Sequence, residues 1–309
     1  MNVSKTKYTP EISVIIPTHK RPTLLKEAIQ SVLNQTFKNF ELIIVNDGYD
    51  KITKNIIFDF NDERIQYIEH EKNKGVSASR NTGVKNSIAK YITFLDDDDM
   101  LPPKSLEISI SIIKKNADNP RIGGVGGSLL FFIKENNKIK FIQELKPIEG
   151  VAKHTTEGGK ICIIKKQALK DIGLYDETLT GSEDTDFSFR FFKKYCLVTT
   201  QETTYYARRH MGPSLHNKIG AVDDYIKTLK KHNLEFKKYP KKAQNIILRT
   251  IGVNLCLEKR MKDGRKYLLA SIKKNPLHLK TYIVFIASFF GQSLVHRLYL
   301  LNTGIKSSH

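Results

Sequence analysis

An alternation of short apolar runs with segments of helical periodicity constrains the fold most. The apolar runs, with the length and composition of strands, are residues 12–16, 41–45, 64–68 and 91–95. Apolar residues at helical spacing follow at 24–33, 77–89 and 103–117. Repeated strand–helix units pack as a parallel sheet covered by helices. The sequence therefore predicts an α/β fold with a mostly parallel, Rossmann-like sheet.

The rest of the chain is less regular and then becomes wholly helical. Strands are expected at 123–132, 138–145 and 160–164, a loop at 147–159, and helices at 167–171 and 187–195. After Asn217 only helical segments are expected, at 222–232, 241–261, 264–274 and 279–301. We therefore predict an α/β domain over residues 1–215 and a smaller helical domain over 216–309.

The formal net charge of +19 is concentrated in the C-terminal part of the chain. Residues 216–309 contain 19 Lys and Arg but only 5 Asp and Glu, a net charge of +14. Such a region attracts an anionic lipid surface, an anionic polymer or nucleic acid, although a basic face that only keeps the protein in solution explains it equally well. An anionic membrane surface is our candidate partner, and nucleic acid is not expected.

The last helical segment contains an apolar run, Tyr282-Ile-Val-Phe-Ile-Ala-Ser-Phe-Phe290. The run is shorter than the roughly 20 apolar residues that cross a bilayer. With Lys280 before it and Arg297 after it, it would suit a helix lying in a membrane interface. An ordinary buried helix is the favoured alternative.

Cysteine usage and the N-terminal segment bear on the compartment. The three cysteines lie far apart without CxxC spacing, so neither a disulfide framework nor a thiolate zinc site is indicated. Residues 1–10 contain no apolar stretch, so we expect no secretory signal. A cytoplasmic location, with peripheral attachment to the inner face of the membrane as an option, is the expectation.

Acidic side chains follow two of the predicted strands directly. Asp47 follows the second strand, and Asp96-Asp97-Asp98-Asp99 follows the fourth. In an open α/β sheet, ligands bind beyond the carboxyl ends of the strands. We therefore expect these aspartates at one sheet edge, near Pro17 and Thr18 at the end of the first strand.

The four adjacent aspartates indicate a metal–diphosphate site. They raise one another's pKa unless a cation neutralises them. Carboxylate oxygens suit Mg²⁺ or Mn²⁺, which leave coordination positions open for phosphate oxygens. The alternative is a solvated acidic turn in which Asp99 caps the helix that begins near Pro103.

Two further segments carry charged side chains at predicted helix starts. In Gly75-Val-Ser-Ala-Ser-Arg-Asn81, Arg80 occupies a first helical turn, where only an anion such as phosphate or Asp47 would offset the helix dipole. A surface arginine is the alternative. Gly181-Ser-Glu-Asp-Thr-Asp186 precedes another helix. Its carboxylates either cap that helix or include a general base for a hydroxyl group.

Taken together, these segments resemble bacterial family 2 glycosyltransferases of the GT-A fold. The resemblance covers residues 10–215. Its segments are Ile12-Ser-Val-Ile-Ile-Pro-Thr18, Leu33-Asn-Gln-Thr36, Glu41-Leu-Ile-Ile-Val-Asn-Asp-Gly48, Gly75-Val-Ser-Ala-Ser-Arg-Asn81, Phe94-Leu-Asp-Asp-Asp-Asp99 and Gly181-Ser-Glu-Asp-Thr-Asp186. More loosely, the helical tail resembles those of bacterial enzymes that build surface polysaccharides.

The resemblance implies a role for individual residues. Those matching nucleotide-sugar-binding positions are Pro17, Thr18, Arg21, Asp47, Arg80, Asp96, Asp97 and His210. Asp98, with His210 as a second candidate, would bind Mn²⁺ or Mg²⁺. Asp184 matches the catalytic base, and Glu183 beside it would orient it or contact the acceptor.

The implied reaction is a metal-dependent, inverting transfer from a nucleotide-sugar. The donor would be a UDP-sugar carrying a hexosyl or N-acetylhexosaminyl group, and the acceptor a glycan or lipid-linked glycan. His19-Lys20 and Tyr49 depart from the family's commoner residues, which bears on which nucleobase the donor carries. The alternatives are a nucleotidyltransferase that uses the same sheet edge and a non-catalytic module that binds anionic surfaces through the basic tail.

Overall fold

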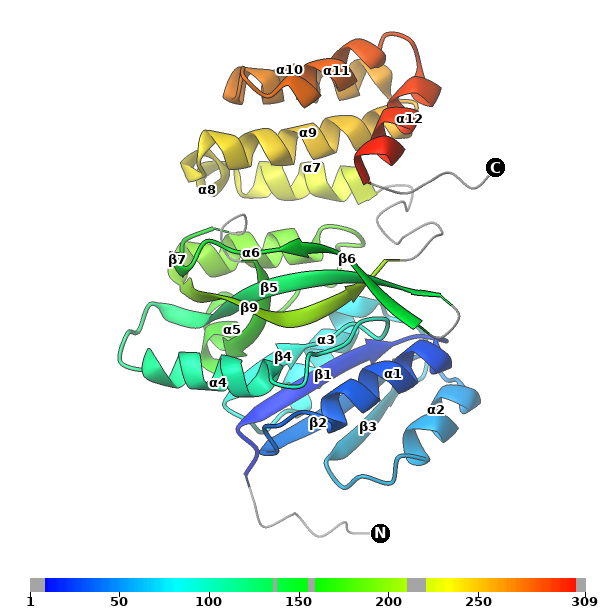
Figure 1. Ribbon diagram of the computed structural model, residues 1–309, viewed down its shortest axis with the longest axis vertical. Coiled ribbons are helices and arrows are strands. Elements are labelled where there is room, and N and C mark those ends of the chain that lie inside the picture. The colour runs from blue at the N-terminus through cyan, green and yellow to red at the C-terminus, as the bar shows by residue number, and fades with distance from the viewer. Residues whose placement is uncertain (1–8, 136–137, 155–158, 210–220, 304–309) are drawn as a thin grey trace. The chain divides into compact units, whose positions relative to one another are not determined.

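The computed structural model describes residues 9–135, 138–154, 159–209 and 221–303 (Figure 1). Its described residues divide into two compact units. One is drawn from Met1–Thr178 and Arg190–Arg209, the other from Leu179–Phe189 and His210–His309. Residues 179–189 therefore group with the C-terminal helices, although the sequence led us to expect them in the α/β domain.

The first unit is a mixed sheet flanked by helices, which confirms the predicted fold class. Its strands are β1 (Ile12–Thr18), β2 (Phe40–Asp47), β3 (Ile65–His70), β4 (Tyr91–Phe94), β5 (Ile122–Glu135), β6 (Lys138–Leu145), β7 (Gly150–Ala152), β8 (Lys160–Lys165) and β9 (Cys196–Arg208). Their order is β3-β2-β1-β4-β8-β5-β9-β7, and β6 pairs with β5. β1 to β4 pair in parallel, whereas β8 runs antiparallel to β4 and β5.

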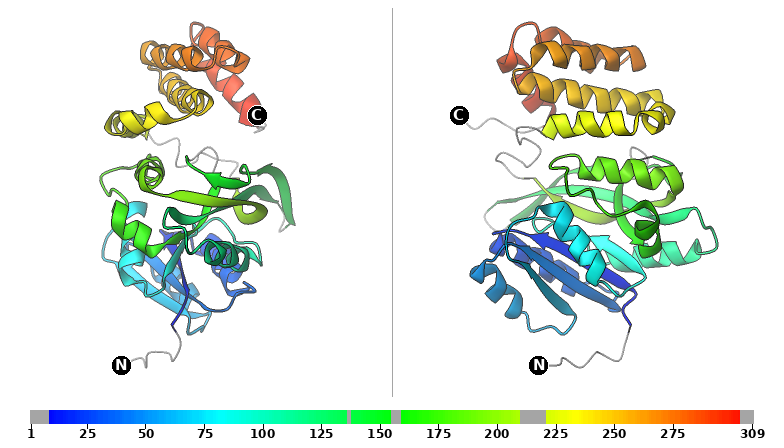
Figure 2. Two further views of the ribbon diagram at one scale, coloured as in Figure 1. Left: turned by 90° about the vertical axis from the view of Figure 1, so that its left-hand side faces the viewer. Right: turned by 180° about the vertical axis from the view of Figure 1, so that it is seen from behind.

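Helices cover both faces of this sheet (Figures 1 and 2). They are α1 (Pro22–Leu33), α2 (Lys51–Phe58), α3 (Val76–Asn86), α4 (Ser105–Lys115) and α5 (Lys166–Ile172). Alternate residues of β1, such as Val14 and Ile16, join the core with α1 and α4. Ile15 points the other way, against Gly83 of α3, where a Cβ would lie only 2.4 Å from Cγ2 of Ile15. β1 is buried on both faces, as its continuous apolar sequence predicts.

The second unit contains a series of helices. They are α7 (Ala221–Lys231), α8 (Asn233–Lys238), α9 (Lys241–Leu257), α10 (Met261–Lys274), α11 (Leu279–Ala287) and α12 (Gln292–Thr303). α7 and α10 lie on opposite sides of α9 (Figures 1 and 2). Small residues allow α9 and α10 to pack closely, since a Cβ on Gly264 would lie 2.4 Å from Sγ of Cys256. Among the described residues, no helix is long and apolar enough to cross a lipid bilayer.

The structure corrects several local predictions. The expected loop at 147–159 contains β7, and β9 was not anticipated. The single helix expected at 279–301 is divided at Gly291, whose φ of +106° interrupts helical geometry. α11 is buried along one side only, so the interpretation as an ordinary buried helix is wrong for its other side. The helix expected at 187–195 is α6 (Glu183–Lys194), which begins four residues earlier.

Candidate active site

The acidic turn, Asp96 to Asp99, lies at the carboxyl end of β4, beside the end of β1. The Thr18 hydroxyl donates to Oδ2 of Asp97 at 2.8 Å. Arg21, just before α1, places Nη1 at 3.2 Å from Oδ1 of Asp97 and 3.1 Å from Oδ2 of Asp98. The parallel pairing of β1 with β4 brings these residues together, because it aligns the ends of the two strands. Pro17 pairs with Val45 of β2 at the same edge.

Two cations flank Asp96. Nη2 of Arg80 lies 2.9 Å from Oδ1 of Asp96, and the Arg80 guanidinium lies 5.1 Å from the centre of the Tyr175 ring. Arg80 is only 5% exposed, so the surface-arginine interpretation is wrong. Nζ of Lys160 lies 3.8 Å from Oδ2 of Asp96 and 4.4 Å from the centre of the Tyr205 ring. Asp96 thus sits between an arginine from α3 and a lysine from β8.

Sequence reasoning missed Lys160 because β8 was not expected to run antiparallel to β4. In that register Tyr91 faces Lys165 and Ile92 faces Ile164. Continued beyond the end of β4, the same register places Lys160 opposite Asp96. Only the neighbour, direction and register of β8 together identify the pair.

The acidic turn has an uneven charge distribution. Burial favours the neutral form of Asp96, but Arg80 and Lys160 outweigh it and lower the pKa of this carboxyl to about 2. Burial raises the pKa of Asp97 to about 6 despite the hydrogen bond from Thr18. Burial, reinforced by repulsion from Asp96, raises the pKa of Asp99 to about 7. The turn therefore combines one carboxyl that its neighbouring cations keep ionised, Asp96, with two whose ionisation burial opposes, Asp97 and Asp99.

Strand β9 holds the acidic turn from the opposite side. The backbone N–H of Arg208 donates to Oδ1 of Asp99 at 2.8 Å, and Nε of Arg208 donates to the carbonyl of Asp98 at 2.9 Å. Nη2 of Arg208 also lies 2.6 Å from Oε2 of Glu27 in α1. Asp99 does not cap the next helix, since α4 begins only at Ser105. The turn is therefore anchored by residues far apart in sequence.

Asp47 is engaged by the loop that leads into α3. Its Oδ1 lies 2.8 Å from Nδ1 of His70 and accepts from the backbone N–H of Lys74 at 2.8 Å. Its Oδ2 accepts from the N–H of Gly75 at 2.7 Å. The other ring nitrogen of His70 lies 2.9 Å from the Thr82 hydroxyl. Asp47 therefore orders the start of α3, the helix that carries Arg80.

Glu183 and Asp184 occupy the first turn of α6, not a loop, and belong to the second unit. Residues 179–189 are attached to α7. The backbone N–H and hydroxyl of Thr180 both donate to Asp224 at 2.8 Å. The hydroxyls of Ser182 and Thr228 lie 2.8 Å apart.

Asp186 provides a third point of attachment. It is fully buried, and its Oδ1 lies 2.8 Å from both Nε2 of His232 and Nζ of Lys231. The Phe189 ring stacks on His232, with ring centres 5.2 Å apart. Asp186 thus binds side chains of the helical unit, beyond the capping role considered from its sequence position.

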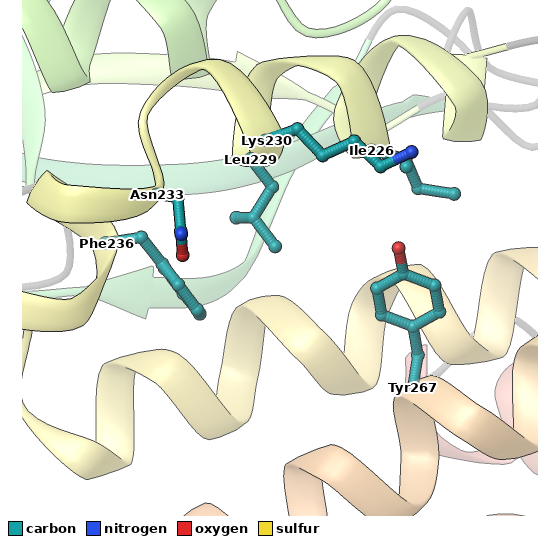
Figure 3. A pocket seen from close by; sticks show the side chains of 6 residues that line it. All are labelled: Ile226, Leu229, Lys230, Asn233, Phe236 and Tyr267. Atoms are coloured by element: carbon teal, nitrogen blue, oxygen red, sulfur yellow. The ribbon is translucent and has the colours of Figure 1, made fainter.

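His210 lies outside the described residues. Within the described ranges, no group of three or more His, Cys, Asp and Glu side chains is arranged to hold a metal ion. A hollow of about 300 Å³ in the second unit is lined by Ile226, Leu229, Lys230, Asn233, Phe236 and Tyr267 (Figure 3). None of these six belongs to the predicted site.

Residues 13–173, more than half of the chain, match the profile of Glycosyl transferase family 2. The chain belongs to this family. The predicted family is thereby confirmed, and with it the enzyme class: this protein is a glycosyltransferase. Neither the nucleotidyltransferase alternative nor the purely non-catalytic one finds support in this assignment.

Relatives extend the comparison. An uncharacterized glycosyltransferase of Rickettsia typhi is 30% identical over 228 residues, 71% of this chain and 70% of the relative. The UDP-Glc:alpha-D-GlcNAc-diphosphoundecaprenol beta-1,3-glucosyltransferase of Escherichia coli is 35% identical over 105 residues, 34% of this chain and 42% of the relative.

The fold is similar to that of a solved structure. Residues 1–349 of S. aureus TarS, in complex with UDP-GlcNAc, align with a TM-score of 0.59 and 17% identity, covering 96% of this chain and 93% of that one. The match covers 54% of a longer TarS structure. At this identity the likeness concerns the fold alone, and it agrees with the predicted GT-A architecture.

Proposed function

We propose that this glycosyltransferase transfers a hexosyl or N-acetylhexosaminyl group from a UDP-sugar to a hydroxyl of a glycan or lipid-linked acceptor, with inversion. The main supporting observation is the acidic turn flanked by Arg21, Arg80 and Lys160 at the carboxyl edge of the sheet. Such an edge binds nucleotides in α/β folds. The names of the E. coli relative and of the TarS complex, which contain UDP-Glc and UDP-GlcNAc, favour a UDP-sugar.

The acidic turn fits a divalent cation shared with the donor. Mg²⁺ is commonly held by one or two carboxylates together with substrate phosphates, so a cage of three or more protein ligands is not needed. Asp98, whose side chain is 19% exposed, would hold the cation, and Asp96, 34% exposed, would lie on the nucleoside side, with the buried Asp97 and Asp99 behind them. When bound, Mn²⁺ or Mg²⁺ would neutralise charge on the leaving diphosphate.

Basic side chains of the protein would share in this neutralisation. Arg80 and Lys160 are held in place by Asp96 and by the rings of Tyr175 and Tyr205, so little reorganisation is needed when phosphate charge develops. Thr18 and Arg21 would fix the turn while the nucleotide binds. Asp47 would act indirectly, by holding the loop before α3.

Asp184 is our candidate for the base that takes the proton from the acceptor hydroxyl. The oxygen would then attack the anomeric carbon on the face opposite the leaving diphosphate. Attachment of residues 179–189 to α7 through Thr180 and Asp186 supplies the rigidity that such a base requires. Glu183, next to it in the same helical turn, would orient the acceptor.

Calorimetry with UDP, GDP, CDP and dTDP, each with and without Mn²⁺, tests the proposal. We expect Mn²⁺-dependent binding of UDP and weaker binding of the others. Asp118→Asn, an exposed site after α4, serves as a control that keeps binding, whereas Asp98→Ala should remove its metal dependence. Tight binding of another nucleoside diphosphate would overturn the UDP assignment, and unchanged metal dependence in Asp98→Ala would overturn the role of Asp98.

A further inference from the structure

Helix α11 has two apolar faces, only one of which is buried. Val284 and Ala287 pack into the core of the second unit, at 6% and 3% exposure. On the opposite side, Leu279, Ile283 and Ile286 are 74%, 52% and 56% exposed. Residues at this i, i+4, i+7 spacing lie on one face of a helix. A globular helix normally places polar residues on that face, so the exposed apolar face requires a partner.

The exposed face continues beyond both ends of the helix. Leu277 before α11 is 90% exposed, and Phe289 and Phe290 after it are 63% and 75% exposed. We call this set the α11 face: Leu277, Leu279, Ile283, Ile286, Phe289 and Phe290. A contiguous exposed apolar surface of this kind marks an interaction site with a protein or a membrane.

The surrounding charge distinguishes between these partners. After Asp263 the sequence contains no acidic residue, but it contains Arg265, Lys266, Lys273, Lys274, Lys280, Arg297 and Lys306. Lys280 and Arg297 are exposed. The guanidinium of Arg265 lies 4.6 Å from the centre of the Phe289 ring, so a cation sits directly beside the α11 face. Apolar side chains bordered by cations such as Arg265 are complementary to an anionic lipid surface.

We infer that the α11 face docks on an anionic lipid bilayer, with α11 lying in the plane of the interface. A second copy of the chain is disfavoured as the occupant because it would bring the same cations into contact with one another. The helix is too short to cross the bilayer, in agreement with an interfacial position. The inference does not depend on which nucleotide-sugar the enzyme uses.

Co-sedimentation of the full chain with lipid vesicles tests this docking. One set of vesicles contains phosphatidylcholine alone, and the other contains phosphatidylcholine mixed with phosphatidylglycerol. We expect binding to the mixed vesicles, weak binding to the neutral ones, and a steep loss with added salt. Each Lys or Arg that reaches the surface contributes about fivefold to the affinity.

Two triple variants distinguish the contribution of the α11 face to vesicle binding from that of exposed apolar side chains elsewhere. Ile283→Ser/Ile286→Ser/Phe290→Ser should bind mixed vesicles at least about tenfold more weakly, because burial of apolar area drives insertion. The matched control, Ile88→Ser/Ile148→Ser/Leu234→Ser, removes three side chains that are 66%, 70% and 70% exposed elsewhere and should bind like the parent. Circular dichroism checks that both variants remain folded.

Three outcomes would overturn the inference. One is that the parent chain does not sediment with mixed vesicles. Another is that the α11-face variant binds them as tightly as the parent does, which would leave charge as the only cause of binding. The third is that light scattering shows a dimeric parent and a monomeric α11-face variant, since a second copy would then cover the face.

Discussion

At the scale of residues, the proposed donor site depends on pairing between opposite charges. Asp96 lies between Arg80 and Lys160, whereas Arg21 contacts Asp97 and Asp98. The pKa of Asp96 falls to about 2 because these cations outweigh its burial. Removal of any one cation therefore changes the charge of the site.

Lys160→Met tests the cation that the sequence did not reveal. Loss of the ammonium group near Asp96 should weaken UDP binding by about 10- to 150-fold, since one charge-assisted contact contributes about 1.5–3 kcal/mol. Calorimetry measures the affinity, and Lys170→Met on the exposed end of α5 is the matched control. Unchanged affinity in Lys160→Met would place Lys160 outside the donor site.

Asp184→Asn tests the base. The amide keeps the shape of the side chain but cannot accept the proton, so we expect kcat to fall by about 10²–10⁴-fold. The affinity for UDP should stay unchanged, because the proposed nucleotide contacts come from other residues. Steady-state kinetics and calorimetry on one preparation separate the two effects. Turnover close to that of the parent enzyme would exclude Asp184 as the base.

At the scale of elements, a network of charges connects three segments of the first unit. Glu27 of α1 lies 2.7 Å from Lys134 at the end of β5 and 2.6 Å from Arg208 at the end of β9. Burial opposes ionisation of Glu27, but its hydrogen bonds with Lys134 and Arg208 prevail and lower its pKa below 4.5. The network holds β9, and through Arg208 the acidic turn, against α1.

Glu27→Gln should weaken this network in a pH-dependent manner. Because the pKa of Glu27 is lowered on folding, its stabilisation is present in full above the unfolded value of 4.5 and disappears as the pH falls through the folded value. At neutral pH we expect a loss of about 1 kcal/mol, since the pair is partly exposed, or about 2–4 °C in Tm. Thermal unfolding should show a lower Tm for Glu27→Gln than for the parent at neutral pH, and equal Tm values at acidic pH. An equal difference in Tm at both pH values would indicate that the variant loses packing and not a charge interaction.

At the scale of the whole molecule, the division into two units does not follow the order of the chain. Residues 179–189 carry the candidate base, yet they pack with α7 and the helices after it. Phe189, only 2% exposed, lies in a cluster with Phe236, Tyr239, Ala243 and Leu248. If Asp184 is the base, as proposed, the helical unit would contribute to catalysis by holding these residues, in addition to its inferred contact with lipid.

Truncation after Arg209 tests this dependence. The shortened chain would keep every strand of the sheet but lose the partners of Thr180, Ser182, Asp186 and Phe189. We expect no measurable turnover and increased binding of a hydrophobic dye. A chain ending at Thr303, which keeps all the described helices, is the control. Full activity of the shorter chain would show that residues 179–189 need no helical partner.

Local sequence patterns were sufficient to predict the fold class, the family and the sheet edge that carries the acidic turn. Hydrophobic periodicity identifies individual strands and helices, and the carboxyl ends of parallel strands necessarily share an edge. This is why Thr18 and Asp96 to Asp98 could be placed together from the sequence, whereas Arg21 was a candidate through the family resemblance alone.

Which distant residues surround that turn depends on how the strands pair across the whole sheet. The antiparallel direction of β8 brings Lys160 to Asp96, and the unanticipated β9 brings Arg208 to Asp99. Neither the direction of a strand nor its neighbour in a sheet is encoded in local periodicity. The same holds for α11. Its own residues are apolar on more than one side, so only packing shows that Val284 is buried whereas Ile283 is exposed.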